Sequence, residues 1–210
     1  MYTPAHFAET RLPELQRLIV NHPLGVLITH SAAGLDANHL PFELDTTQGP
    51  YGTLRAHVAR KNPVWQQAPT GTEVLVVFRG AAGYISPNWY PSKHETHQQV
   101  PTWNYEAVHV HGRLVVRDDE KFVRGVVARL TRTHEASEPK PWKMGDSEPG
   151  YIDSMLQAVV GLEIEVLRLE GKFKLSQNKD ERDRSGTASA LQDLGHEALA
   201  GRMRQTMPPA

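Results

Sequence analysis

The sequence predicts an α+β protein in which helices flank a small antiparallel barrel of six strands. The predicted strands are joined by connections of a few residues, and such short connections suit antiparallel neighbours because parallel strands need a crossover of a dozen or more residues. The strands do not alternate with helices as a doubly wound sheet requires. The chain has 210 residues, of which 39% are hydrophobic and 22% charged. This composition is typical of one globular domain, and we expect residues 1–210 to form a single domain.

The first half of the chain predicts one helix and three strands. Apolar residues at helical spacing predict a helix over residues 13–22, and Pro23 ends the run. Short apolar segments bounded by turn residues then predict strands over residues 25–30, 37–45 and 51–59.

The second half predicts three more strands and the remaining helices. Asn62 and Pro63 are suited to cap a brief helix over residues 64–68. An apolar run predicts a buried strand at 74–78, and alternating residues predict strands at 107–117 and 162–175. Amphipathic or polar periodicity predicts helices at 122–130, at 151–160 and from about Ala188 onward.

Composition excludes several classes of function. The chain has no cysteine, which excludes disulfide frameworks, thiolate metal sites and cysteine nucleophiles, and which fits a reducing compartment. Its 23 Lys and Arg residues against 24 Asp and Glu give a formal charge of −1, so no global basic field draws it to nucleic acid or acidic lipid. The N-terminus lacks the pattern of a signal peptide, and no apolar run approaches the ~20 residues that span a bilayer. We therefore expect a cytoplasmic protein.

The first candidate binding segment lies where a predicted strand meets a predicted helix. His57 is in the strand, Arg60 and Lys61 end it, and Asn62 caps the helix. Free N–H groups at a helix start, together with two adjacent cations, suit a phosphate. The alternative is a solvated turn with a hydrogen-bonded strand histidine, because helix starts far outnumber ligand sites.

The second candidate consists of two aromatic and amide-rich segments, residues 80–90 and 100–105. Ser86, Trp103 and Asn104 are the members that we single out. Ring faces can stack on a planar ligand, and amide or backbone groups can bind the polar edge of a heterocycle. The alternative is that the aromatic residues belong to the core and that proline and asparagine form ordinary loops.

The third candidate is the run from Lys172 to Lys179. The two-residue period of a strand places Lys172, Lys174 and Ser176 on one face and the apolar residues between them on the other, with Gln177 and Asn178 following. This cationic, hydrogen-bonding face suits an anion or the edge of a flavin. Acidic residues nearby also allow a plain solvated surface.

Two histidine patterns do not predict a metal site. His94 and His97 have one residue too few between them for the zinc-binding helix motif. His109 and His111 share a strand face, but two ligands without a third favour ordinary strand histidines. We also find neither of the two common glycine-rich nucleotide motifs.

These segments together resemble the FMN-binding negative transcriptional regulator family, the PaiB-like proteins. The similarity covers nearly the whole chain. Its motifs, in order, are NHLPF at 38–42, HVARKNP at 57–63, YISPNWY at 84–90, VPTWNY at 100–105 and KLSQNK at 174–179.

The resemblance implies a split β-barrel related to the pyridoxine-phosphate oxidase and flavin-reductase folds, usually a homodimer with FMN in a groove at the subunit interface. Carried over by position, His57, Arg60, Lys61 and Asn62 would hold the ribityl phosphate, and residues 86–90 and 103–105 would flank the isoalloxazine ring. Four residues, from the same or the second subunit, would complete the cofactor wall: Lys174, Ser176, Gln177 and Asn178.

Three functions are compatible with these features. The first is an FMN-binding cytoplasmic regulator in which the flavin reports redox or metabolic state. The second is a flavin-dependent oxidoreductase on the same scaffold, such as a flavin reductase, a small oxidase or a haem-degrading relative. The third is a dimeric binding protein that has lost its ligand. The sequence itself gives little support for direct DNA reading, because the basic residues after Lys172 are diluted by acids.

Overall fold

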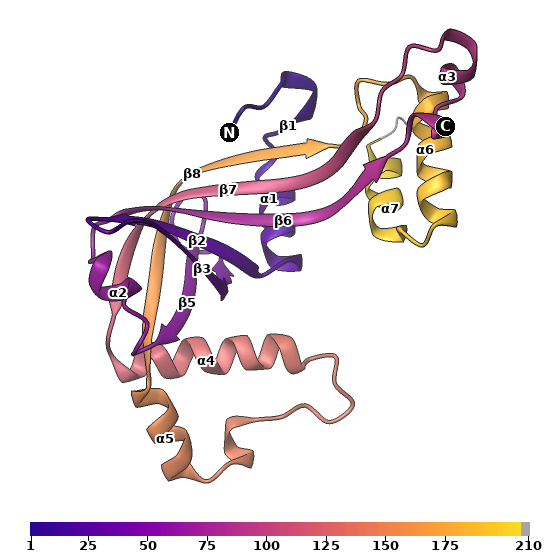
Figure 1. The fold of residues 1–210 in the computed structure, drawn as a ribbon. Helices are drawn as coiled ribbons and strands as arrows, with labels where there is room; N and C mark the ends of the chain where they lie inside the picture. Colours follow the sequence, from indigo (N-terminus) through magenta and orange to yellow (C-terminus); the bar gives the residue numbers. More distant parts are fainter. Residues whose placement is uncertain (207–210) are drawn as a thin grey trace. The chain divides into compact units, whose positions relative to one another are not determined.

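The computed structural model describes residues 1–206, and over this range the chain is a mixed α+β protein with one antiparallel sheet of eight strands (Figure 1). The hydrogen-bonded order is β3-β2-β6-β7-β8-β5-β4, and β1 pairs with β8. The two end strands of this path, β3 and β4, do not close the sheet. The strands are β1 (Ala8–Glu9), β2 (Leu24–Ser31), β3 (Gly34–Pro41), β4 (Glu43–Asp45), β5 (Thr53–Ala59), β6 (Glu73–Ile85), β7 (Thr102–Arg117) and β8 (Val159–Lys174).

Seven α-helices occur in the described part of the chain. They are α1 (Leu12–Asn21), α2 (Val64–Gln67), α3 (Pro91–Thr96), α4 (Glu120–Glu135), α5 (Pro149–Gln157), α6 (Glu181–Asp193) and α7 (Glu197–Gln205). Three short 3₁₀ turns lie at Ala5–Phe7, Pro87–Trp89 and Met144–Asp146. None of the helices within residues 1–206 has the length and apolar character needed to cross a membrane.

The number of strands differs from the six that the sequence predicts. The predicted strand over 37–45 is two strands, β3 and β4, because the N–H of Phe42 between them donates to the carbonyl of Pro23 at 2.8 Å. The other additional strand is β1, in which two residues pair with Gly171 and Lys172. Such a short segment has no periodicity of its own, and tertiary pairing alone makes it a strand.

The chain divides into two compact units, which we describe separately. Unit 1 contains residues 1–18, 79–108 and those from 170 onward, and unit 2 contains residues 19–78 and 109–169. Strands β6, β7 and β8 each contribute residues to both units. The expectation of a single domain remains a prediction.

Unit 1 has its core between the sheet and the antiparallel helices α6 and α7, which lie side by side (Figure 1). A Cβ atom at Gly83 on β6 would lie 2.9 Å from Leu199 of α7, so any larger residue there would force the Leu199 side chain to shift. The sheet and both helices supply the other large buried side chains of this core: Ile85, Phe173, Leu175, Leu191 and Met203.

Unit 2 has its core between strands β2, β5, β6 and β8, where Leu27, Leu54, Phe78 and Ile164 are buried. Helices α4 and α5 pack against each other through Val123, Ile152 and Leu156 (Figure 1).

Candidate functional site

One face of unit 1 carries aromatic rings and lysines on three neighbouring strands. It consists of Tyr84 on β6, Trp103 and Tyr105 on β7, and Lys172 and Lys174 on β8, and we call it the aromatic–lysine face. The residues between them, such as Asn104 and Phe173, are buried on the other side of the sheet. Strand alternation therefore gathers these five side chains on one surface.

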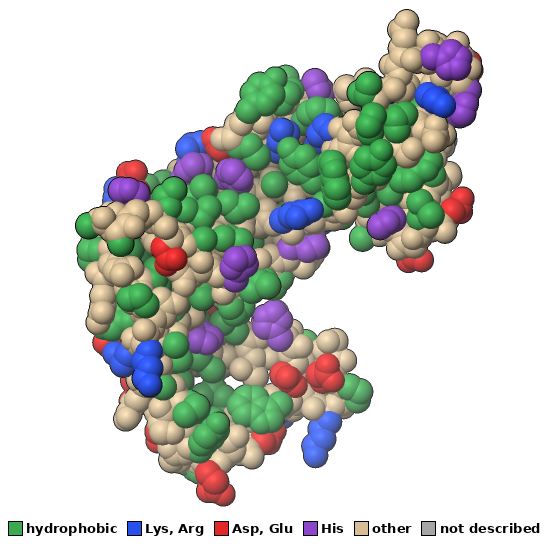
Figure 2. Space-filling view, in the orientation of Figure 1, with side chains coloured by type: hydrophobic (Ala, Val, Ile, Leu, Met, Phe, Trp, Pro, Cys, Tyr) green, Lys and Arg blue, Asp and Glu red, His purple; other side chains and the backbone are tan. Residues whose placement is uncertain are grey.

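The members of this face touch one another. The Tyr84 and Trp103 rings meet edge to face with centroids 6.3 Å apart. The Lys174 ammonium donates to the Trp103 carbonyl at 2.6 Å and to the Thr102 hydroxyl, and the Lys172 ammonium lies 5.5 Å from the Tyr105 ring. Figure 2 shows Lys and Arg side chains among hydrophobic ones over this part of the sheet. The rings remain accessible, since Trp103 is 55% exposed and Tyr84 47%.

The lysines of this face have no carboxylate partner within residues 1–206. Lys172 donates to the Tyr2 carbonyl, and nearby Lys179 donates to the Gln99 side chain. Partial burial, with the charges of Lys172 and Lys179, lowers the pKa of Lys174 below its ordinary value. An anion placed here would relieve the repulsion among these ammonium groups.

A buried polar layer lies behind the face. Asn104 is fully buried and donates to the Ser176 hydroxyl at 2.9 Å and to the Met203 sulfur at 3.4 Å. Within residues 1–206 the Asn104 side-chain oxygen has no hydrogen-bond partner. Ser176 has a φ of 64°, in the left-handed region. The prediction that Ser176 shares the face of Lys172 and Lys174 is therefore wrong, because β8 ends at Lys174 and the chain turns there.

The remaining sequence-predicted site residues of unit 1 either form hydrogen bonds with nearby backbone groups or are exposed to solvent. The Ser86 hydroxyl accepts from the N–H of Asn88 at 3.2 Å and caps a 3₁₀ turn. Gln177 folds back on β8, where its amide donates to the Phe173 carbonyl at 2.5 Å and its oxygen accepts from the N–H of Leu175 at 2.7 Å. Asn178 is exposed.

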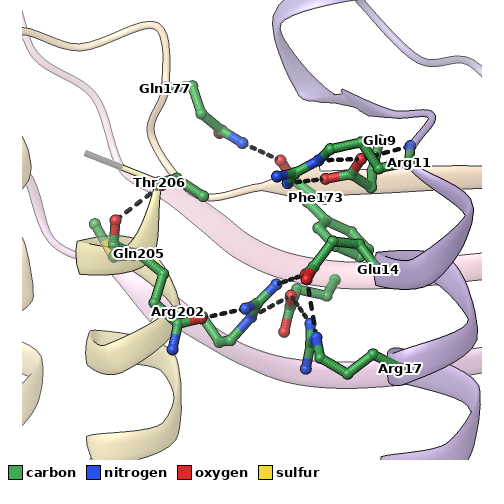
Figure 3. Close-up of polar contacts among 11 residues, drawn as sticks. Glu9, Arg11, Glu14, Arg17, Phe173, Gln177, Arg202, Gln205 and Thr206 are labelled. Atoms are coloured by element: carbon green, nitrogen blue, oxygen red, sulfur yellow. Dashed lines mark hydrogen bonds and ion pairs between the residues drawn. The ribbon is translucent and has the colours of Figure 1, made fainter. Parts of the chain in front are cut away.

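An ion-pair cluster centred on the buried carboxylate of Glu106 joins helices α1 and α7 to the sheet (Figure 3). Arg202 donates to Glu106 at 2.7 Å and to Glu14 at 3.1 Å, and Arg17 approaches the same two carboxylates at 3.6 and 3.1 Å. The Arg202 guanidinium also lies 5.6 Å from the Phe173 ring. This cluster fixes β7 and β8 from behind the aromatic–lysine face.

The predicted phosphate-binding turn lies in unit 2. The Arg60 guanidinium makes a bidentate pair with Asp118 at 2.6 and 2.9 Å and also donates to two backbone carbonyls. Asn62 caps α2 by accepting from the N–H of Val64 at 2.9 Å and donates to Asn38 at 2.7 Å. Lys61 is exposed, with no side-chain partner in the described chain. A phosphate at this turn would rely chiefly on Lys61, since Arg60 is already neutralised.

His57, the fourth predicted phosphate residue, lies on β5 opposite Gly161 of β8. Burial lowers the pKa of His57, so its ring is neutral near pH 7, and its Nδ1 atom has no hydrogen-bond partner in the described part of the chain. A neutral imidazole contributes no charge to anion binding.

The structure therefore places the predicted residues in two groups. Trp103 and Lys174 lie together on the aromatic–lysine face of unit 1, whereas Arg60, Lys61 and Asn62 lie together at a turn in unit 2. Tyr84, Tyr105 and Lys172 were not singled out as ligands, although Tyr84 and Tyr105 lie in the second candidate segments and Lys172 in the third. Alternation around Phe173 predicts that Lys172 shares the face of Lys174, and the same alternation around Asn104 places Tyr105 on the face of Trp103.

A sheet flanked by helices, with exposed aromatic rings and with ammonium groups that lack a carboxylate partner in residues 1–206, has the chemistry to bind a planar anionic ligand. Residues 1–168 match a protein-family model described as "Putative FMN-binding domain". The chain belongs to this family of FMN-binding domains, and FMN is its cofactor.

Two curated relatives match over almost their full length. The Bacillus subtilis protein named "Protease synthase and sporulation protein PAI 2" is 30% identical over 193 residues, covering 92% of this chain and 90% of the relative. An uncharacterized protein of Aspergillus fumigatus is 33% identical, covering 96% of this chain and 94% of the relative. The resemblance to the PaiB-like proteins is confirmed by the first of these.

The fold is shared with solved structures of split-barrel proteins. An FAD- and haem-binding protein from Mycobacterium smegmatis superposes with a TM-score of 0.57 at 14% identity, covering 84% of this chain and 78% of that one. A protein from Bacteroides thetaiotaomicron described as a "putative 5-nitroimidazole antibiotic resistance protein" superposes with a TM-score of 0.56 at 12% identity, covering 79% of this chain and 85% of that one.

The side chains of the aromatic–lysine face fit the chemistry of FMN. Tyr84 and Trp103 offer ring faces and edges for the planar flavin, and Lys172 and Lys174 offer donors for its carbonyl edge or its phosphate. Bound FMN supplies hydride and single-electron chemistry. The aromatic–lysine face would orient the flavin ring and place positive charge beside it.

Proposed function

We propose that this protein binds FMN on the aromatic–lysine face. The observation that carries this proposal is the juxtaposition of Lys172 and Lys174, which have no carboxylate partner in the described chain, with the exposed rings of Tyr84 and Trp103. Positive charge next to a flavin stabilises its anionic reduced form. The lysines would thus both raise affinity for the phosphorylated cofactor and favour its reduction.

We propose further that the working form is a homodimer with the flavin at the subunit interface. Tyr2 and Val100 of unit 1 are 84% and 72% exposed, and Trp103 lies on the same unit with more than half of its surface in solvent. Exposed apolar side chains that gather in one patch mark a site of protein or ligand binding. A second copy of the chain, together with the cofactor, would cover them.

The role that we propose for the dimer is regulation of transcription in the cytoplasm, with the flavin reporting redox or metabolic state. Similarity to the Bacillus subtilis protein named for protease synthesis and sporulation supports a regulatory role. DNA affinity would come from local cationic surface, because the net charge of −1 gives no global attraction.

A flavin-dependent oxidoreductase is the second candidate. The accessible rings of Tyr84 and Trp103 favour it, since a small substrate could reach a flavin held beside them. No side chain is assigned a catalytic role.

A visible absorbance spectrum of the purified protein, with and without added FMN, tests cofactor binding directly. We expect a flavin band or the uptake of FMN; an absorbance blank after incubation with both FMN and FAD would remove the basis of both functions. A salt titration against promoter DNA and random duplex then separates them. A regulator binds the promoter more tightly, whereas equal binding to both duplexes contradicts direct repression.

A further inference from the structure

We propose that unit 2 carries a second ligand site, for a small planar aromatic carboxylate, in a cavity between α4 and the loop that follows it. The cavity has a volume of about 420 Å³, which lies within the range of pockets that hold small organic molecules. Every residue that lines it belongs to unit 2, so the site is separate from the aromatic–lysine face of unit 1.

The walls of this cavity are mostly apolar. Small side chains on one side of α4, including Ala128 and Thr131, leave room facing the loop. The loop supplies the Trp142 indole and the Met144 thioether opposite them. An indole stacks on aromatic ligands, and a thioether adapts to their edges.

The loop is held in place at both ends of the cavity wall. The Glu135 carboxylate at the end of α4 accepts from the N–H of Trp142 at 2.8 Å. The N–H of Lys143 donates to Asp146 at 2.9 Å, and Met144 packs against the apolar contact between α4 and α5. Because these contacts fix the loop before a ligand binds, binding would cost little conformational entropy.

The charges around the cavity select an anion. Arg132 and Lys143 line it, and neither side chain has a carboxylate partner within residues 1–206. Glu135, the acidic lining residue, already accepts the Trp142 N–H. Two cations against one engaged carboxylate leave a net positive rim over an apolar floor, which matches a carboxylate carried on an aromatic ring system.

Binding of naphthoate to the full-length protein, followed by the Trp142 indole resonance in NMR, tests this site. We expect a dissociation constant of about 0.1 mM or lower. The Trp142 signal, assigned by its loss in Trp142→Phe, should shift on titration. In the double variant Arg132→Gln/Lys143→Gln we expect naphthoate to bind at least about tenfold more weakly, whereas uncharged naphthamide should be little affected.

Two controls separate this site from others. Lys140→Gln changes a charge in the same loop at a residue that does not line the cavity, and it should leave naphthoate affinity unchanged. Lys174→Gln, on the aromatic–lysine face, should leave the Trp142 shift intact even if flavin binding is lost. Naphthoate binding without a Trp142 shift, equal affinity in wild type and the Arg132→Gln/Lys143→Gln variant, or no binding at millimolar concentration (about 1 mM) would each overturn the proposal.

Discussion

Replacing Arg202 by methionine tests whether the ion-pair cluster around buried Glu106 stabilises unit 1. The substitution keeps most of the length and apolar contact of the side chain, including contact with Phe173, but removes the guanidinium. Glu106, whose side chain is 2% exposed, then loses its hydrogen bond of 2.7 Å, and Glu14 loses one of 3.1 Å.

The expected loss of stability depends on the ion-pair partner that Glu106 keeps after Arg202 is replaced. Breaking a buried pair by removing one partner costs about 3–5 kcal/mol, because an uncompensated charge stays behind. Arg17 remains 3.6 Å from Glu106, so we expect the low end of that range, about 3 kcal/mol. For a chain of this length, that loss lowers the melting temperature by roughly 6–12 °C.

Thermal and urea unfolding of Arg202→Met, Glu106→Gln and the double variant measure this cost. The double variant should be less destabilised than the sum of the single variants, because Glu106→Gln removes the charge that Arg202→Met leaves unpaired. Arg182→Met is the matched control: Arg182 pairs with Glu95 at 2.6 Å, but both side chains are more than half exposed, and no measurable change is expected.

Two outcomes would refute this reasoning. A loss of stability in Arg202→Met no larger than that in Arg182→Met would show that the buried position of Glu106 does not matter. Additive effects of Arg202→Met and Glu106→Gln would show that the two side chains are not coupled.

Three further predictions concern unit 2. Burial lowers the pKa of His57 below its ordinary value of 6.5, so the unfolded chain binds a proton more readily than the folded one; the free energy of unfolding should fall as the pH drops below 6.5, and His57→Gln should flatten that part of the urea-derived pH profile. A Cβ at Gly161 would lie 2.5 Å from Phe122, so Gly161→Ala should cost about 1–3 kcal/mol in urea unfolding, while Gly145→Ala, with open space around it, should be near neutral. If the phosphate binds at the β5–α2 turn, Lys61→Ala weakens FMN more than riboflavin in calorimetry; equal weakening moves the phosphate elsewhere.

Much of the fold could be predicted from local patterns. The helix predicted over 13–22 occurs at Leu12–Asn21, because helical periodicity and Pro23 mark it, and the strand predicted over 25–30 occurs at Leu24–Ser31, because turn residues bound its apolar run. The extension of β6 to Ile85 could not be predicted. Its run of glycine and alanine from Gly80 to Gly83 has low strand propensity, and packing against α7 dictates its conformation.

The parts of the candidate site that follow strand alternation could be predicted from the sequence. The parts that depend on contacts with residues distant in the sequence could not. Lys172 and Lys174 share a face as their spacing predicts, but nothing local indicates that Ser176 adopts a left-handed conformation. Arg60 has the position of a phosphate ligand, yet its partner Asp118 lies 58 residues away in the sequence. Long-range pairing of this kind has no local signature.

A calorimetric titration of FMN into wild type, Lys172→Gln/Lys174→Gln and Lys121→Gln tests the location of the cofactor most directly. Lys121 is an exposed lysine of α4 in unit 2 and serves as the charge control. If the aromatic–lysine face holds FMN, the double variant binds it at least about tenfold more weakly for each lysine removed, and Lys121→Gln binds it as wild type does. Identical affinity in all three proteins would place the cofactor elsewhere.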